Sequence, residues 1–175
     1  EPSRRQRQMC IRDRLKRLHD AIKDGDTIYG VVRGIGSSSD GRGKGITAPS
    51  QRGQVQAIAR AYQQAQYEPS SVELVEAHGT STKVGDATEL STLSTLWKGF
   101  EKGNHVAVGS IKSQIGHLKA AAGIAGIIKA TMALHNSVIP PSAGFETPNP
   151  TVDWDNICLL YTSEAADEKV RVGGG

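Results

Sequence analysis

The sequence predicts an α/β domain with a layered sandwich architecture, in which helices cover both faces of a sheet. Short segments rich in β-branched residues alternate along the chain with segments of helical apolar spacing, which is typical of this class. The 175 residues are 37% apolar, which is enough to bury a core. A net charge of only +3 together with this apolar content excludes bulk disorder.

The N-terminal part is predicted to contain the end of a helix, a strand and a glycine-rich loop. Apolar residues at helical spacing predict the helix end within residues 15–22, and β-branched residues predict a strand over residues 27–33. Five glycines within residues 34–45 predict a loop. This loop is not a P-loop, because Gly45 stands where Ser or Thr is required. It also lacks the dinucleotide fingerprint, because Ser39 replaces the third glycine.

The central part contains two predicted helices, separated by a short strand. Pro49 marks the start of the first helix, and Pro69 with the two serines after it ends that helix. Residues 72–77 predict a strand. A capping box formed by Asp86 and Glu89 predicts the start of the second helix. The apolar positions are Val55, Ile58, Ala59, Tyr62 and Ala65 in the first helix and Leu90, Leu93, Leu96 and Trp97 in the second.

The C-terminal part is predicted to contain a strand over residues 106–111 and then a long helix of small residues. The longest apolar stretch, residues 120–134, includes Lys129 and is shorter than the roughly 18 residues that a membrane span requires. A transmembrane helix is therefore not expected. Four prolines at positions 140, 141, 148 and 150 predict an irregular segment after the helix.

The basic character of the chain comes from one short segment. Residues 1–17 carry seven basic and two acidic side chains, whereas the rest of the chain carries 14 basic and 16 acidic ones. Such a run is typical of an arm that binds nucleic acid. It lacks the apolar region of a secretory signal peptide, so a signal peptide is not expected.

The coding of the two ends favours another origin for this run. Codons that can encode residues 158–163 are, apart from a frame offset, the reverse complement of the last part of codons that can encode residues 4–13, and the complement continues through residues 164–168 with a single departure. Both stretches resemble translated transposon-end adapters of sequencing libraries. We therefore predict that residues 1–14 and 158–175 are translated adapter and tail, and that residues 15–157 are the natural protein. A genuine basic arm and a genuine C-terminal strand are the alternative.

Two histidines are candidates for catalysis. His78 follows the predicted strand at residues 72–77 and His117 follows the one at residues 106–111, each with a glycine beside it and a helix after it. Ligands bind at the carboxyl ends of strands in α/β sheets, where two imidazoles can donate hydrogen bonds to an oxyanion or one can move a proton. Lys112, five residues before His117, adds a positive charge. A metal site is not expected, because no Cys or carboxylate stands at ligand spacing to either histidine.

The other three histidines lack such surroundings. His19, His105 and His135 are interpreted as surface or packing residues. A purely structural role is also the alternative for His78 or His117 taken singly, and it is the presence of both in matching settings that favours function.

Two long motifs surround the candidate histidines. They read Glu76-Ala77-His78-Gly79-Thr80-Ser81-Thr82 with Gly85-Asp86, and Gly109-Ser110-Ile111-Lys112-Ser113-Gln114-Ile115-Gly116-His117 followed by the small residues 120–123. They resemble the β-ketoacyl synthases, and more narrowly the ketosynthase domains of type I polyketide and polyunsaturated fatty acid synthases. The resemblance runs over about residues 15–157. It implies a thiolase-like layered sandwich of two related α/β halves, of which this chain matches the C-terminal half, so that the domain is incomplete.

The resemblance also implies an activity and partners. The family reaction is the decarboxylative Claisen condensation of an acyl thioester with a malonyl-type extender on acyl carrier protein, an acyl transfer in polyketide or fatty acid biosynthesis. No cofactor is expected to bind directly, because the carrier protein's phosphopantetheine carries the substrate. The expected partners are the acyl carrier protein, the N-terminal half of the same domain and a second copy in a homodimeric parent. Nucleic acid and membrane are not expected partners, and the cytoplasm is the expected location.

Individual roles follow from the same resemblance. His78 and His117 match the two catalytic histidines, which help decarboxylate the extender and stabilise the enolate. Lys112 matches the lysine that orders the site electrostatically. Thr80 and Thr82 match threonines that hydrogen-bond the phosphopantetheine arm. Asp86 and Glu89 match acidic positions with an expected structural role.

The nucleophile is the main departure from the family pattern. The family cysteine lies well upstream of His78, in a region this sequence does not contain, and Cys10 and Cys158 stand in the wrong places. The chain alone is therefore expected to be inactive. The alternative to an enzyme fragment is a non-condensing, ketosynthase-like module that binds carrier protein. A degradative thiolase fits less well, because the loop before His117 follows the synthase pattern.

Overall fold

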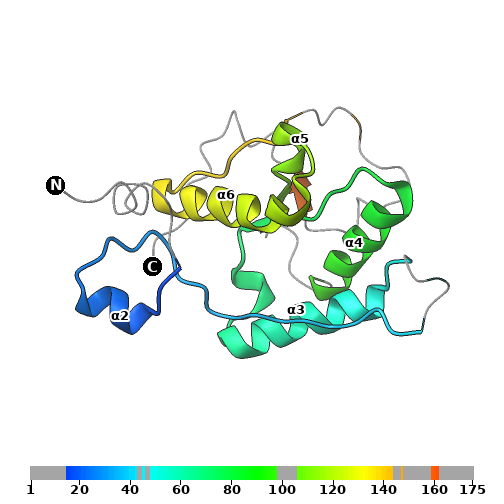
Figure 1. Cartoon of the computed structure of the whole chain (residues 1–175). Helices are drawn as coiled ribbons and strands as arrows, with labels where there is room; N and C mark the ends of the chain where they lie inside the picture. The colour runs from blue at the N-terminus through cyan, green and yellow to red at the C-terminus, as the bar shows by residue number, and fades with distance from the viewer. Residues whose placement is uncertain are drawn as a thin grey trace. The chain divides into compact units, whose positions relative to one another are not determined.

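A computed structural model describes residues 15–42, 45, 48–97, 106–143, 147 and 159–161 (Figure 1). The chain divides into two compact units between Val31 and Val32. In the first unit, helix α2 (Leu18–Lys23) ends before a turn in which Lys16 forms ion pairs with Asp24 and Asp26. The helix predicted within residues 15–22 is present, but it begins at Leu18 and ends at Lys23. The second unit contains all the other described elements.

The predicted strand over residues 27–33 is wrong, because this segment forms no strand with any described part of the chain. Beyond it, the glycine-rich segment lies directly against helix α3 (Gln51–Ala65). A Cβ atom on Gly36 would lie 1.8 Å from the carbonyl oxygen of Ala57, so only glycine allows this approach. The Ile35 N–H donates to Gln64 Oε1 at 2.7 Å. β-Branched residues favour extended backbone, but a strand also needs a neighbour to pair with.

The sheet consists of three parallel strands in the order β1 (Leu74–Glu76), β2 (Val106–Gly109) and β3 (Leu159–Tyr161). Val75 pairs with Val108, and Ala107 pairs with Leu160. All four residues of the central strand β2 are buried. The predicted α/β class and both predicted strands on the two sides of α4 (Lys83–Leu96) are therefore confirmed, with shorter bounds.

Strand β3 belongs to the C-terminal segment that the coding pattern assigns to an adapter. Its pairing with β2 uses backbone N–H and C=O groups, which any sequence without proline supplies. The assignment of residues 158–175 therefore stays a prediction.

The helices are begun and ended by local signals. The Ser50 side chain accepts a hydrogen bond from the Gly53 N–H at the start of α3, and Gln66 ends that helix in the left-handed conformation. Three short helical turns flank the segments that carry the histidines. η1 (Pro69–Ser71) precedes β1, α5 (Lys112–Ile115) precedes His117, and η2 (Lys119–Ala121) follows His117. The long helix of small residues is α6 (Ala122–Asn136).

The predicted capping box is wrong. Helix α4 begins at Lys83 with Thr82 at the N-cap position, so Asp86 lies inside the first turn instead of starting the helix. The Glu89 carboxylate binds the backbone of a loop that precedes the helix, as described below. Asp86 and Glu89 have the spacing of a capping box, but Glu89 binds backbone N–H groups about ten residues before it instead of the first residues of its own helix.

The core lies between α4, α3 and the sheet. The predicted apolar face of α4 is confirmed, since Leu90, Leu93 and Trp97 are buried against Val106 and Val108 of β2. Fully burying each such side chain contributes about 1.5–3 kcal/mol. From α3, the Tyr62 ring packs edge-on against Trp97, with ring centroids 6.2 Å apart. The buried Thr92 hydroxyl donates to Gln54 Oε1 at 2.7 Å, which fixes α3 on α4.

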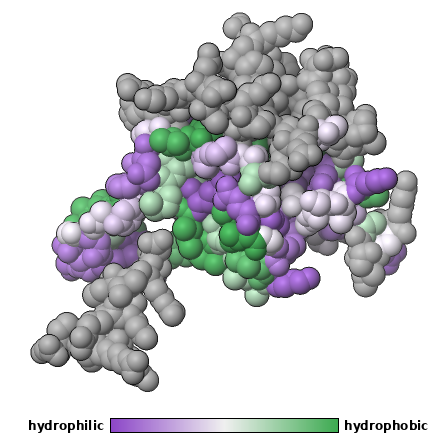
Figure 2. All heavy atoms as spheres, turned by 90° about the horizontal axis from the view of Figure 1, so that it is seen from above, coloured by the Kyte–Doolittle hydropathy of each residue, from purple (hydrophilic) through white to green (hydrophobic). Residues whose placement is uncertain are grey.

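Helix α6 is apolar on nearly all sides. Its exposed apolar residues are Ile124, Ile127, Ile128, Met132 and Leu134. A helix that is apolar all round is typical of a central layer, buried on more than one side. Figure 2 shows a contiguous area of apolar side chains near the centre of this face, and smaller apolar areas elsewhere on it. None of the helices in the described ranges is long and apolar enough to cross a bilayer.

Candidate active site

The structure brings His78 and His117 together. Strands β1 and β2 are parallel neighbours, so their carboxyl ends lie at the same edge of the sheet. His78 follows β1 with only Ala77 between them, and His117 follows the single turn of α5 with only Gly116 between them. The two imidazole rings meet edge to face with their centroids 5.4 Å apart. Both side chains are exposed, so a substrate can reach them.

The loop that carries His78 is held by Glu89 of α4. The carboxylate accepts the N–H of His78 at 2.6 Å through Oε1 and the N–H of Gly79 at 2.9 Å through Oε2. Gly79 has a positive φ of 46°, and a Cβ there would lie 2.9 Å from the Cβ of Ser110. The glycine therefore lets the His78 loop approach the loop that leads to Lys112.

The loop that carries His117 fixes the tautomer of its ring. The Lys119 N–H donates to His117 Nδ1 at 3.0 Å, and Lys119 adopts a left-handed φ of 55° in this turn. Because Nδ1 is an acceptor, the neutral ring carries its proton on Nε2 and can donate from there. Desolvation by the surrounding atoms lowers the pKa of His117, and the positive charges of Lys112, His78 and Lys119 lower it further.

A cavity of about 430 Å³ contains both histidines. Besides the two histidines, its wall carries the charged residues Glu76, Lys112 and Lys119. Helix α6 contributes Ile127 and four small residues to the wall, namely Ala122, Gly123, Gly126 and Ala130. Three of the five predicted site residues, His78, His117 and Lys112, are thus placed around one cavity. Within the described residues there is no cluster of three or more side chains suited to a metal ion.

Thr80 and Thr82 lie on the same loop as His78, but the structure does not place them on the cavity wall. Their hydroxyl oxygens are 3.1 Å apart and share a hydrogen bond. Ser81 between them has a positive φ of 60°. Both hydroxyls lie beside Gly85, where an added Cβ would lie 2.4 Å from Thr82 Oγ1.

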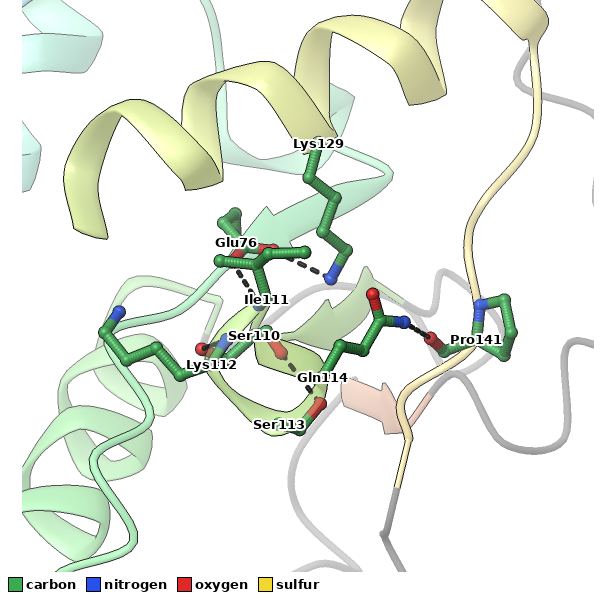
Figure 3. A network of polar contacts seen from close by, with 8 residues as sticks. All are labelled: Glu76, Ser110, Ile111, Lys112, Ser113, Gln114, Lys129 and Pro141. Atoms are coloured by element: carbon green, nitrogen blue, oxygen red, sulfur yellow. Dashed lines mark hydrogen bonds and ion pairs between the residues drawn. The ribbon is translucent and has the colours of Figure 1, made fainter. Parts of the chain in front are cut away.

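A buried ion pair beside the cavity was not predicted from the sequence. Lys129 Nζ of α6 lies 2.8 Å from Glu76 Oε2 of β1, with side chains only 8% and 14% exposed, respectively. Glu76 Oε1 also accepts the Ile111 N–H at 2.6 Å (Figure 3). One signal was present: Lys129 is the only charged residue in the apolar stretch 120–134. The other histidines do not extend the site, since His19 and His135 are exposed on helices and His105 lies outside the described residues.

The chain has close relatives among megasynthases. A family model described as the β-ketoacyl synthase C-terminal domain matches residues 29–146. The chain is 51% identical over 142 residues to a polyunsaturated fatty acid synthase polypeptide from a Thraustochytrium species, and the match covers 79% of this chain and 5% of that one. It is 49% identical over 150 residues to the hybrid PKS-NRPS synthetase pytA of Aspergillus terreus, and this match covers 86% of this chain and 22% of that one.

Solved ketosynthases share the fold. The ketosynthase from module 6 of the bacillaene synthase of Bacillus subtilis 168 superposes with a TM-score of 0.79 at 40% sequence identity. The match covers 83% of this chain and 26% of the solved chain. This confirms the predicted thiolase-like architecture and the match to the C-terminal part of the domain. The chain therefore spans a small fraction of the proteins that it matches, and it belongs to the β-ketoacyl synthase family as a piece of the ketosynthase C-terminal domain.

Proposed function

We propose that the cavity between His78 and His117 is the place where a ketosynthase of a polyketide or polyunsaturated fatty acid synthase decarboxylates its extender. The observation that carries this proposal is the juxtaposition of the two rings, 5.4 Å apart, on one cavity. The Nδ1 acceptor role of His117 supports it, because it leaves an Nε2–H donor for an oxyanion.

The reaction then proceeds in two steps, decarboxylation of the extender and condensation with the acyl group. In the malonyl-type thioester, the bond between the carboxylate carbon and the α-carbon breaks, carbon dioxide leaves, and the electron pair forms a thioester enolate. His117 and His78 donate hydrogen bonds to the enolate oxygen. The α-carbon of the enolate then attacks the carbonyl of an acyl group held on a cysteine, and the cysteine thiolate leaves. The products are a β-ketoacyl thioester on the carrier, carbon dioxide and the free thiolate.

Lys112 is assigned an electrostatic role in this proposal. Its positive charge on the cavity wall attracts the extender carboxylate and disfavours a second positive charge on His117. A neutral His117 keeps Nδ1 as an acceptor and Nε2–H as a donor, whereas an imidazolium would lose the hydrogen bond from the Lys119 N–H.

Thr80 and Thr82 are assigned to the phosphopantetheine arm of the carrier protein. Their position on the His78 loop, outside the cavity wall, supports a place along the approach to the histidines. No cofactor of the chain's own enters this proposal.

The nucleophile is assigned to another part of the synthase domain. Cys10 and Cys158 lie outside the described residues and outside the family match at residues 29–146. We therefore infer that the chain alone does not condense, because its sequence holds no other thiol to carry the acyl group.

The proposed partners are the N-terminal part of the same domain, the acyl carrier protein and a second copy of the parent. The exposed apolar residues of α6 support the first of these, since an isolated patch of this kind is rarely left facing water. A cytoplasmic location of the parent synthase belongs to the same proposal and rests on the family alone.

The natural protein is proposed to comprise residues 15–157 of this sequence. The complementary coding of the two ends supports this. Genomic DNA of the source organism should depart from these codons before residue 15 and after residue 157, with another strand-forming sequence in the place of β3. Continuous reading through both ends would contradict the proposal.

Condensation by the complete synthase domain tests the proposed function. The domain, loaded with an acyl group and given malonyl carrier protein, should yield the β-ketoacyl carrier, detected by mass spectrometry as an acyl chain longer by two carbons. Transfer of the unextended acyl group without loss of carbon dioxide would instead show a non-condensing module.

A further inference from the structure

We propose that Glu76 and Lys129 form a positioning pair, in which Glu76 fixes the turn that carries Lys112 and Lys129 holds Glu76 in place. This inference rests on the proposed function for its effect on catalysis, while its structural part can be tested independently. Glu76 lies on the wall of the cavity that contains the histidines, whereas Lys129 does not. Figure 3 shows the pair together with the turn that carries Ile111 and Lys112.

The Glu76 side chain adds one hydrogen bond between β1 and the segment after β2, beyond the last backbone hydrogen bond of the two strands. The Ala77 N–H donates to the Gly109 carbonyl at 2.7 Å, and beyond Gly109 strand β2 ends. The Glu76 side chain then reaches across and accepts the Ile111 N–H at 2.6 Å. Ile111 is the N-cap residue of α5, whose first residue is Lys112.

The turn is therefore tied to the strand that leads to His78. α5 has only one turn, so its own hydrogen bonds do little to hold it in place. Gly116 and His117 follow it directly. A displacement at Ile111 would move Lys112 and, through α5, His117. Glu76 itself stands two residues before His78 on the neighbouring strand, so its hydrogen bond to Ile111 links the two histidine-bearing loops.

Lys129 makes this acceptor possible. Burying an isolated carboxylate is strongly unfavourable, and Lys129 Nζ compensates it at 2.8 Å from Oε2. Gly126, one turn earlier on α6, leaves the space for the carboxylate, because a Cβ there would lie 3.0 Å from Glu76 Cγ. The single charge in an otherwise uncharged stretch is thus placed where the carboxylate needs a partner.

Stability alone does not account for such a pair. Replacing a buried ion pair by apolar residues of similar size is often neutral or stabilising, while removal of one partner is costly. An apolar pair could fill the same space but could not accept the hydrogen bond from the Ile111 N–H. A positioning role therefore requires an acceptor at residue 76, whereas a packing role does not.

Two double variants of the complete synthase domain make use of this difference. Glu76→Gln/Lys129→Met removes both charges but keeps an oxygen acceptor for the Ile111 N–H. Glu76→Leu/Lys129→Met removes both charges and the acceptor. Lys83→Met, at the exposed start of α4, is the control for the loss of a lysine charge. Thermal unfolding of each variant checks that it is folded.

Release of labelled carbon dioxide from malonyl carrier protein is the catalytic measurement. The Leu/Met variant should lose on the order of 10- to 100-fold in kcat, as expected when catalytic groups are displaced slightly, with little change in KM. The Gln/Met variant should recover most of this loss. Equal kcat in the Leu/Met variant and the wild type, or equal losses in both double variants, would overturn the proposal.

Amide hydrogen exchange tests the structural part without reference to activity. The Ile111 amide should exchange faster in the Leu/Met variant and remain protected in the Gln/Met variant. The Ser113 amide, which donates to the Ser110 carbonyl at 3.1 Å within the turn, is the internal reference. Unchanged protection of Ile111 in the Leu/Met variant would overturn the proposal. A wild-type domain that releases no carbon dioxide would contradict the proposed function instead, and exchange would still decide the role of the pair.

Discussion

The carboxylate of Glu89 holds the backbone of His78 from a helix that follows it in sequence. It accepts the N–H of His78 at 2.6 Å and that of the adjoining Gly79 at 2.9 Å, so one side chain sets where the His78 loop leaves β1. Both N–H groups lie beyond the end of the strand, so the conformation of the loop depends on this long-range contact.

Replacing Glu89 should therefore destabilise the domain through the His78 loop. In the complete synthase domain, Glu89→Ala should lower the free energy of unfolding by about 1–3 kcal/mol, since two backbone N–H groups lose their acceptor. Glu89→Gln should cost less, because one oxygen remains. Glu68→Gln, with an exposed side chain ahead of η1, is the control. Chemical denaturation measures the effect, and equal stability of Glu89→Ala and the wild type would contradict it.

His117 should titrate below its ordinary pKa of 6.5. Desolvation is the first cause, and the charges of Lys112, His78 and Lys119 act in the same direction. The unfolded chain then binds more protons than the folded one between the lowered value and 6.5, so the contribution to stability is present above pH 6.5 and is lost as the pH falls through this interval. Decarboxylation should decline over the same range as His117 becomes protonated.

An NMR titration of the ring measures this shift directly. Lys112→Met should move the pKa of His117 back toward 6.5, because one repelling charge is removed. A His117 pKa at or above 6.5 in the wild type would contradict the assigned tautomer and charge state.

Residues 15–157 expressed alone should associate and unfold without a sharp transition. The reason is α6, where Ile124, Ile127 and Leu134 are among five large apolar side chains that face solvent. Size-exclusion chromatography over a range of concentrations and calorimetry measure these properties. Addition of the N-terminal part of the ketosynthase domain should reduce the association. A monomer with a cooperative transition and condensing activity would show that the domain boundary is misplaced.

The parts predicted correctly from the sequence depend on local pattern and on strand order. His78 and His117 each follow a strand, and neighbouring parallel strands end at one edge of a sheet, so their meeting follows from topology. The core face of α4 follows from helical spacing of Leu90, Leu93 and Trp97. These features need no knowledge of a distant partner.

The errors and omissions concern contacts between distant segments. Residues 27–33 have the composition of a strand, but pairing requires a neighbour that composition does not reveal. Glu89 has capping-box spacing, yet its carboxylate oxygens accept backbone groups of the preceding loop. The pairing of Glu76 with Lys129 joins β1 to α6, and only the isolated lysine in an apolar stretch indicated that such a partner exists.

Extender decarboxylation by histidine variants of the complete synthase domain tests the central claim most directly. His117→Ala and His78→Ala should each lower the release of labelled carbon dioxide from malonyl carrier protein by about 100- to 1000-fold, the usual cost of losing one oxyanion donor. Acylation of the cysteine should remain largely intact, and His19→Ala on α2 should behave as the wild type. Wild-type carbon dioxide release in either His117→Ala or His78→Ala would contradict the assignment of these two residues to the enolate.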